Sequence, residues 1–291
     1  MRILSSPEEM HAACRELRRQ GLRLGLVPTM GALHEGHLSL VRMARAQAQA
    51  VAVSLFVNPL QFGPAEDYGK YPRNFERDRE LLSAERVDLL FAPTPEQMYA
   101  PGAATYVTVE GMSDKLCGRS RPGHFRGVTT VVAKLFHVVE PDLAFFGQKD
   151  AAQVAILKRM VRDLNFAVQI VVGPTVREPD GLALSSRNAY LDAQQRKSAT
   201  VLYRALMRIQ TLADKGERSA EALLRGGKDV IAEEPAVRLD YLEIVNADTL
   251  DAVSDISAGA LVAVAAYVGS TRLIDNLVLQ GAGEAAGPRL A

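Results

Sequence analysis

The chain has 291 residues, of which 48% are hydrophobic, and its 34 Lys and Arg balance its 34 Asp and Glu. This length accommodates one large or two medium domains with buried cores. The net charge of zero argues against nonspecific nucleic-acid binding. The longest apolar run, residues 261–268, is too short to span a bilayer. We therefore expect a cytoplasmic protein with neither nucleic acid nor membrane as a partner.

Apolar runs of strand length alternate with amphipathic segments over the first part of the chain. The strand candidates are residues 22–27, 51–57, 87–92, 143–146 and 168–172. The helical segments are residues 7–20, 37–49, 74–85, 127–139 and 149–163. This alternation predicts an α/β fold with a doubly wound parallel sheet, in which ligands bind beyond the C-terminal ends of the strands.

The composition changes after about residue 188. An Ala-, Arg- and Gln-rich helical pattern comes first, followed by strand candidates at 240–245 and 261–266 and by a strand and turn at 271–276. We therefore expect a catalytic domain over residues 1–176 and a smaller α+β domain over residues 177–291. The glycine- and alanine-rich tail from residue 281 is expected to be flexible.

The two cysteines form no metal or redox motif. Cys14 lies in a helical pattern and Cys117 in a predicted loop. Their number and spacing fit a reducing compartment, and a buried thiol is the expectation for Cys14.

The first motif, PTMGALHEGHLSLV at residues 28–41, joins a strand that we expect to end at Pro28 to a helix that we expect to begin at His37. Glycines in the turn let the backbone approach phosphate oxygens at the helix N-terminus. His34 and His37 are about one helical turn apart, so both can stabilise charge on a phosphorus centre. A zinc site and two surface histidines without function remain alternatives.

The second motif, NPLQFG at residues 58–63, follows the next strand. Asn58 and Gln61 place amide donors and acceptors at the mouth of that strand, which suits a small polar substrate. An Asn-Pro turn that only ends the strand is the alternative.

The third motif, GRSRPGHFRGV at residues 118–128, forms a local basic patch in a neutral chain. Three arginines and His124 indicate a phosphate or carboxylate ligand. A solvated basic loop is the alternative.

The fourth motif, FFGQKD at residues 145–150, again joins a strand end to a helix start. Lys149 opposes the helix macrodipole there, which suggests that it serves a phosphate ligand. Asp150 could cap the helix, bind a ribose or approach magnesium.

The fifth motif runs from residue 174 to residue 188 and contains Gly181, Ser185, Ser186 and Arg187. The glycine, the two hydroxyls and the arginine suit a mobile phosphate clamp, in which Arg187 neutralises a leaving pyrophosphate. A serine nucleophile is disfavoured because no Gly-x-Ser-x-Gly elbow surrounds either serine.

These motifs carry a family resemblance. PTMGALHEGH resembles the HxGH signature of the nucleotidyltransferase superfamily that includes class I tRNA synthetases, and in its longer form it resembles the pantoate–β-alanine ligases. FVNPLQF, RPGHFRGV, FGQKD, the Ser-Ser-Arg loop and TRLIDN at residues 271–276 match that family in its order. Gln148 departs from the pattern, because many members carry Glu there, and we give it no catalytic role.

The resemblance implies a Rossmann-like, homodimeric ligase that uses ATP and Mg²⁺ to condense pantoate with β-alanine through pantoyl adenylate. The catalytic residues that it implies are His34, His37, Lys149 and Arg187. The implied ATP-binding residues are Met30, Gly31, His34, His37, Gly147, Lys149, Asp150, Val176, Leu184, Ser185, Ser186 and Arg187. Pantoate and β-alanine are assigned Asn58, Gln61, Arg121, His124 and Gln153. Asp78 is assigned to Mg²⁺, with a solvated helix face as its alternative.

Other classes of protein remain open on the residues alone. A generic nucleotidyltransferase would share the HxGH site without needing the amides of Asn58 and Gln61. A noncatalytic nucleotide sensor would need neither Lys149 nor the Ser-Ser-Arg loop. A tRNA-charging enzyme would need a basic appended domain, which the composition does not indicate.

Overall fold

The computed structural model of the protein describes residues 1–64 and 66–281. The tail that we expected to be flexible lies, beyond Gly281, outside these residues. Within the described ranges, none of the helices combines the length and the hydrophobicity that a bilayer crossing requires.

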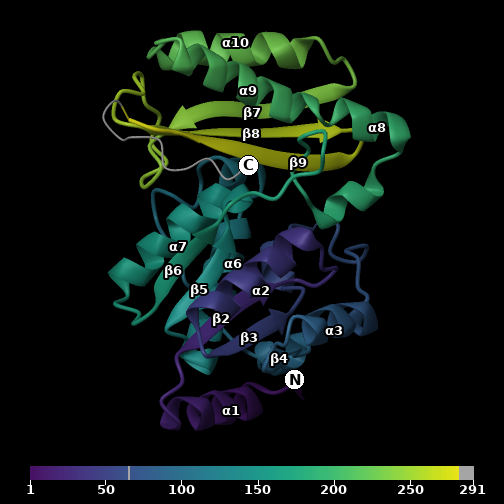
Figure 1. The fold of residues 1–291 in the computed structure, drawn as a ribbon, viewed down its shortest axis with the longest axis vertical. Helices are drawn as coiled ribbons and strands as arrows, with labels where there is room; N and C mark the ends of the chain where they lie inside the picture. Colours follow the sequence, from purple (N-terminus) through teal and green to yellow (C-terminus); the bar gives the residue numbers. More distant parts are fainter. Residues whose placement is uncertain (65, 282–291) are drawn as a thin grey trace. The chain divides into compact units, whose positions relative to one another are not determined.

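The chain divides into two compact units, each described by itself below (Figure 1). The first unit comprises Met1–Gln148 and Ile156–Val176, and the second comprises Lys149–Ala155 and the chain from Arg177 onward. One division between the units falls between Val176 and Arg177, and the segment Lys149–Ala155 packs with the C-terminal part of the chain. The domain bounds 1–176 and 177–291 stay a prediction.

The first unit is built on a six-stranded parallel sheet in the order β1-β4-β3-β2-β5-β6. Its strands are β1 (Arg2–Leu4), β2 (Leu24–Thr29), β3 (Ala50–Leu55), β4 (Leu89–Phe91), β5 (Leu143–Gly147) and β6 (Gln169–Gly173). The chain moves outward from β2 through β3 to β4 and then returns to β5 on the other side of β2. The predicted doubly wound sheet is confirmed, and its switch point lies between β2 and β5.

Helices connect these strands and cover the sheet. They are α1 (Pro7–Arg19), α2 (Glu35–Gln47), α3 (Phe75–Ala84), α4 (Pro95–Met98), α5 (Cys117–Ser120), α6 (His124–Val139) and α7 (Ala151–Asp163), with the 3₁₀ turns η1 (Pro59–Gln61) and η2 (Gln148–Asp150). Leu40 of α2 and Leu82 of α3 join the core cluster of Val53. Leu26 and Ala52, which alternate with that cluster along their strands, are buried as well. Both faces are therefore covered, as a parallel sheet requires.

Two strands differ from the prediction. β1 was missed, because three residues that pair only with β4 at the edge are too short to show a period. β2 continues through Pro28 to Thr29 instead of ending at the proline. β5 pairs with β2 only at Gly25 and Leu26, so the end of β2 that contains Pro28 is hydrogen-bonded to β3 alone. The backbone N–H that proline lacks is not needed on the open side.

Two helices begin earlier than predicted. α2 begins at Glu35, because the side chain of His34 caps it. α6 begins at His124, after Gly123 enters it with a left-handed φ of 82°. Both changes place a motif histidine at a helix start.

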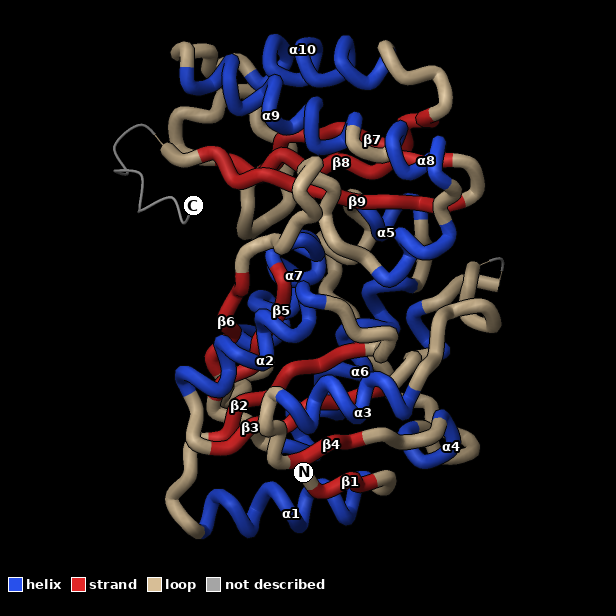
Figure 2. The backbone as a smooth tube through the Cα atoms, turned by 45° about the vertical axis from the view of Figure 1, so that its right-hand side comes forward, coloured by secondary structure: helices blue, strands red, loops and turns tan. Residues whose placement is uncertain are grey.

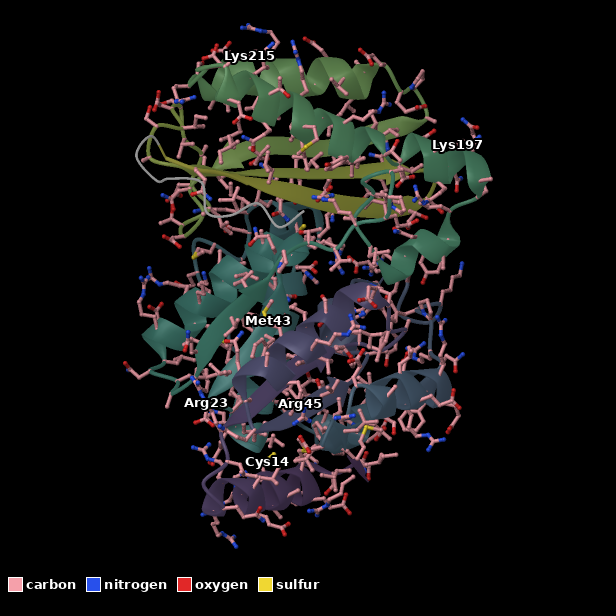
Figure 3. The ribbon with its side chains drawn as sticks, viewed as in Figure 1. Cys14, Arg23, Met43, Arg45, Lys197 and Lys215 are labelled. Atoms are coloured by element: carbon pink, nitrogen blue, oxygen red, sulfur yellow. The ribbon has the colours of Figure 1, made fainter. Side chains whose placement is uncertain are left out.

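The cysteines are both free and buried. Cys117 begins the short helix α5, so its predicted loop is wrong. Cys14 lies on the side of α1 that faces the sheet (Figure 3). Burial raises the pKa of the Cys14 thiol to about 12, with help from the Glu140 carboxylate and against the Arg18 charge. Such a thiol is unreactive at neutral pH.

The second unit contains an antiparallel sheet in the order β7-β8-β9 (Figure 2). Its elements are the 3₁₀ turn η3 (Ser186–Tyr190), the helices α8 (Ala193–Ser198), α9 (Val201–Asp214) and α10 (Ala220–Ala232), and the strands β7 (Val237–Val245), β8 (Ala260–Val268) and β9 (Thr271–Leu279). α9 and α10 pack together against one face of the sheet (Figure 1). The smaller α+β unit is confirmed, but β9 runs straight on to Leu279 where a turn was predicted.

Candidate active site

The two motif histidines cap α2 at the C-terminal end of β2. His34 Nδ1 accepts a hydrogen bond from Gly36 N (3.2 Å), and His37 Nδ1 accepts one from His34 N (3.3 Å). The ring centroids lie 4.1 Å apart, so the rings are side by side, as their spacing predicted. Because each Nδ1 accepts an amide hydrogen, each neutral ring carries its proton on Nε2. The pair therefore presents two N–H donors from one helix start.

Asp78 holds the loop that leads to these histidines. Gly31 (φ 82°) and Ala32 (φ 51°) are both left-handed, and such consecutive turns need support. The Asp78 oxygens accept hydrogen bonds from Ala32 N and Leu33 N, each at 2.8 Å. Asp78 is only 2% exposed, so the solvated helix face is wrong. Its magnesium role stays a prediction, and these contacts favour a role in holding the loop.

Asn58 is buried beside the 3₁₀ turn after β3, with both polar atoms of its side chain engaged. Its Nδ2 donates to Gln61 Oε1 (3.1 Å) and to the Gly127 carbonyl (3.0 Å). Its Oδ1 accepts from Leu60 N (3.3 Å) and from the Tyr99 hydroxyl (2.8 Å). The predicted substrate contact of Asn58 is therefore less favoured than a role in orienting Gln61.

Gln61 connects the second motif to the first. Its Nε2 donates to Met30 Sδ (2.9 Å) at the end of β2. A Cβ on Gly127 would lie 2.2 Å from the Leu60 carbonyl oxygen, so only glycine lets α6 approach the turn that carries Gln61. The first three motifs thus form one packed arrangement at the strand ends.

Arg121 and His124 hold the backbone of Gln61. Arg121 NH2 (3.3 Å) and His124 Nδ1 (2.8 Å) both lie within hydrogen-bond distance of the Gln61 carbonyl oxygen. Arg121 NH1 lies 3.0 Å from His124 Nε2. An Nδ1–H that donates to the carbonyl while Nε2 accepts from Arg121 satisfies both contacts.

Glu66 is the partner of Arg121 that sequence reasoning missed. Its carboxylate takes two hydrogen bonds from the guanidinium, at 2.8 Å and 2.6 Å. The Arg121 side chain is only 15% exposed, so a solvated basic loop is wrong for this residue. Burial alone would raise the pKa of Glu66, but the hydrogen bonds and charge of Arg121, assisted by His124, lower it overall. The Arg121 charge, one of those predicted to bind an anion, is thus balanced by Glu66 within the protein.

Lys149 lies in the turn η2, just before α7, so the helix start that we predicted at Lys149 falls two residues later, at Ala151. Its Nζ is 3.6 Å from Asp150 Oδ2, and its carbonyl oxygen accepts a hydrogen bond from Asn276 Nδ2 at 2.8 Å. At Gly147, which ends β5, no atom of the described residues beyond its chain neighbours lies within 4 Å of the position that a Cβ would take. Gln153 is half-buried on α7.

The Ser-Ser-Arg segment has a packed first half. Glu178 and Leu182 form a tight hairpin, with Glu178 N 2.9 Å from the Leu182 carbonyl oxygen. Gly181 (φ 92°) packs against Tyr203, where a Cβ would lie 2.0 Å from a ring carbon. We therefore expect any closure over a nucleotide to be confined to the residues after this hairpin.

The second half of the segment carries the hydroxyls. Ser185 caps η3, because its Oγ accepts a hydrogen bond from Arg187 N at 3.3 Å. Val176, Leu184, Ser186 and Arg187 are half-buried.

The side chains of this site differ in how well they suit zinc and magnesium. Among residues 1–64 and 66–281, no three His, Cys, Asp or Glu residues gather to hold a metal ion. The zinc alternative for His34 and His37 therefore lacks further ligands in the described chain. Mg²⁺ needs no such group, since it is commonly held by substrate phosphates, waters and one or two carboxylates. Asp150, whose side chain is 45% exposed, has a carboxylate that fits this mode.

The comparisons with known proteins agree on one family. The family model for Pantoate-beta-alanine ligase matches residues 2–278. The chain belongs to the pantoate–β-alanine ligase family.

Individual relatives match over nearly their whole lengths. The chain is 62% identical over 289 residues to the pantothenate synthetase of Koribacter versatilis (strain Ellin345), covering 99% of each. It is 53% identical to a pantothenate synthetase crystal structure from Thermus thermophilus, with a TM-score of 0.91, covering 95% of this chain and 99% of that one. A ligase from Francisella tularensis, crystallised with βγ-ATP and β-alanine, is 33% identical with a TM-score of 0.79, covering 96% and 97%.

The predicted family, fold class and enzyme class are therefore confirmed: the chain is a member of an amide-forming ligase family that makes pantothenate. The noncatalytic sensor and the tRNA-charging enzyme are not supported.

Sequence reasoning missed four supporting residues: Glu66, Tyr99, Asp275 and Asn276. Only the last two carried a signal, because they belong to the closing TRLIDN motif, to which no chemistry was assigned.

Proposed function

We propose that this protein condenses pantoate with β-alanine in two steps. A pantoate carboxylate oxygen attacks the α-phosphorus of ATP, which forms pantoyl adenylate and releases pyrophosphate. The β-alanine amine then attacks the acyl carbon, and AMP leaves. A free carboxylate acylates poorly because its leaving group would be oxide, and adenylation provides a better one.

The reciprocal capping of His34 and His37 is the observation that carries this proposal. It holds two Nε2–H donors at the C-terminal end of β2, beside the switch point where doubly wound sheets bind ligands. Preorganised donors stabilise the charge that develops on phosphate oxygens without reorganising during the reaction. Met30 and Gly31, which lead into this helix, contact the bound nucleotide.

Lys149 and Arg187 supply the positive charge. Lys149 binds phosphate oxygens as a point charge, and the Arg187 guanidinium neutralises the departing pyrophosphate. The other proposed ATP contacts are Gly147, Asp150, Val176, Leu184, Ser185 and Ser186. Asp150 would approach a Mg²⁺ ion bound with ATP, and such an ion would shield the phosphate charges from the incoming carboxylate.

Gln61 and Gln153 bind pantoate. An amide donates and accepts at once, so it can bind both a hydroxyl and a carboxylate without adding charge that competes with the phosphates. The contacts of Asn58, Met30, Arg121 and His124 support an ordered Gln61. In this scheme these residues position Gln61, and Arg121 and His124 also border the β-alanine site.

Isotope exchange between pyrophosphate and ATP tests the scheme. Pantoate, ATP and Mg²⁺ alone should support exchange, because the first step needs no amine. A requirement for β-alanine would contradict a free adenylate intermediate. Exchange supported by phosphorylated acceptors in place of pantoate would instead point to a generic nucleotidyltransferase.

For assembly and location we propose a homodimer in the cytoplasm. The family resemblance supports a homodimer, and two free cysteines support a reducing, cytoplasmic environment. Light scattering of the purified protein measures the first directly.

A further inference from the structure

The closing motif places two buried polar side chains next to each other on β9. Asp275 is 4% exposed and Asn276 is 5% exposed. Consecutive residues of a strand point to opposite faces of the sheet. Leu273 and Leu279, which share the Asp275 face, belong to the core that α9 and α10 cover, so Asn276 faces the other way.

Each of these side chains holds a distant segment of the same unit. Asp275 accepts two hydrogen bonds from Arg177, at 2.6 Å and 2.9 Å, and Arg177 also stacks on Tyr203. Asn276 Nδ2 donates to the Lys149 carbonyl oxygen at 2.8 Å. The sheet itself does not need these groups, since an apolar side chain would fill either position without a polar group to satisfy.

The contact with Lys149 bears on how that side chain is presented. Lysine has a long flexible stem, and its ammonium acts as a point charge without a preferred geometry. A hydrogen bond to the Lys149 carbonyl fixes the peptide plane at the base of the stem. This restricts the backbone angle ψ of Lys149 and therefore the directions that its ammonium can reach.

We propose that Asn276 is a positioning residue for Lys149, which it holds through the main chain so that the ammonium meets the ATP phosphates. This inference rests on the proposed role of Lys149. Asp275 supports the same unit by anchoring Arg177, where the segment that carries Ser185 and Arg187 begins.

A double-mutant cycle tests the proposal. Asn276→Leu keeps the branching and the number of side-chain heavy atoms but replaces the amide with larger methyl groups, and Asn276→Ala is the second variant if the first does not fold. Either should lower the rate of pyrophosphate exchange about tenfold, the effect of losing one hydrogen bond of about 1.4 kcal/mol. The apparent affinity for pantoate should not change. Val278→Thr is the matched control, because Val278 lies on the same strand and is 40% exposed.

The cycle separates positioning from general damage to the fold. If Asn276 acts through Lys149, then Asn276→Leu should add nothing to the loss caused by Lys149→Ala. Losses that multiply, or an Asn276→Leu variant as fast as the wild type, would overturn the inference while leaving the role of Lys149 intact. An unchanged rate in Lys149→Ala alone would refute that role and the inference with it.

Discussion

In the first unit the predicted site residues are held by loops that follow adjacent parallel strands. In the second unit they are held by the single strand β9, which comes late in the chain. Gln61 contacts Met30 and Asn58, both at neighbouring strand ends. Lys149 is held by Asn276, 127 residues away. The parallel sheet thus brings its own site residues together, while the antiparallel sheet supports segments that do not belong to it.

The difference has a physical origin. Every strand of a parallel sheet ends at the same edge, so polar residues after successive strands meet without further design. The 3₁₀ turn η2 and the hairpin at Gly181 are not brought to their partners by a shared sheet edge. Buried Asp275 and Asn276 hold them instead, through their hydrogen bonds to Arg177 and to the Lys149 carbonyl.

The largest effects are expected from removing one hydrogen-bond donor in each unit. His37→Ala and Lys149→Ala should each slow pyrophosphate exchange by roughly 10²-fold or more, because each removes a donor from the developing phosphate charge. Exchange kinetics on variants with unchanged circular dichroism measure this. Should only one of the two variants be slow, the first step would depend on one region alone.

Asp78→Asn tests how far the first unit depends on its loop support. The new amide cannot accept both backbone N–H groups, so we expect a loss of about 1 to 3 kcal/mol in stability and a slower exchange. The Mg²⁺ concentration that gives half-maximal rate should stay the same. A large rise in that concentration, with stability unchanged, would restore the magnesium role. Glu80→Gln, on the exposed side of the same helix, is the control.

Gln61→Ala tests the division of substrates between the motifs. A lost neutral hydrogen bond is worth about 0.5 to 1.5 kcal/mol, so pantoate affinity should fall severalfold while ATP affinity is kept. Separate calorimetric titrations of the two ligands measure this. The opposite pattern would assign Gln61 to the nucleotide.

The smallest effect concerns the Glu66–Arg121 pair. Because the folded state lowers the pKa of Glu66 below its ordinary value of 4.5, the pair stabilises the fold fully above that pH and less as the pH falls through the lowered pKa. We expect Glu66→Gln to cost about 1 kcal/mol at pH 7 and less at low pH. Urea unfolding at several pH values measures the difference, and a cost independent of pH would argue against the ion pair.

Much of this protein follows from local pattern. The strand and helix periods predicted the doubly wound sheet, because a parallel sheet leaves continuous apolar runs between amphipathic helices. The motifs then placed His37, Gln61 and Lys149 after strands, and the order of the motifs along the chain predicted the family.

Tertiary structure decided which polar groups meet. The pairing of Glu66 with Arg121, the loop support from Asp78, and the hold of Asn276 on Lys149 join residues far apart in the chain. No periodicity encodes such contacts. They depend on burial. In the sequence a carboxylate or an amide is expected to be a solvated surface group, but once packing removes it from water it needs a hydrogen-bond partner.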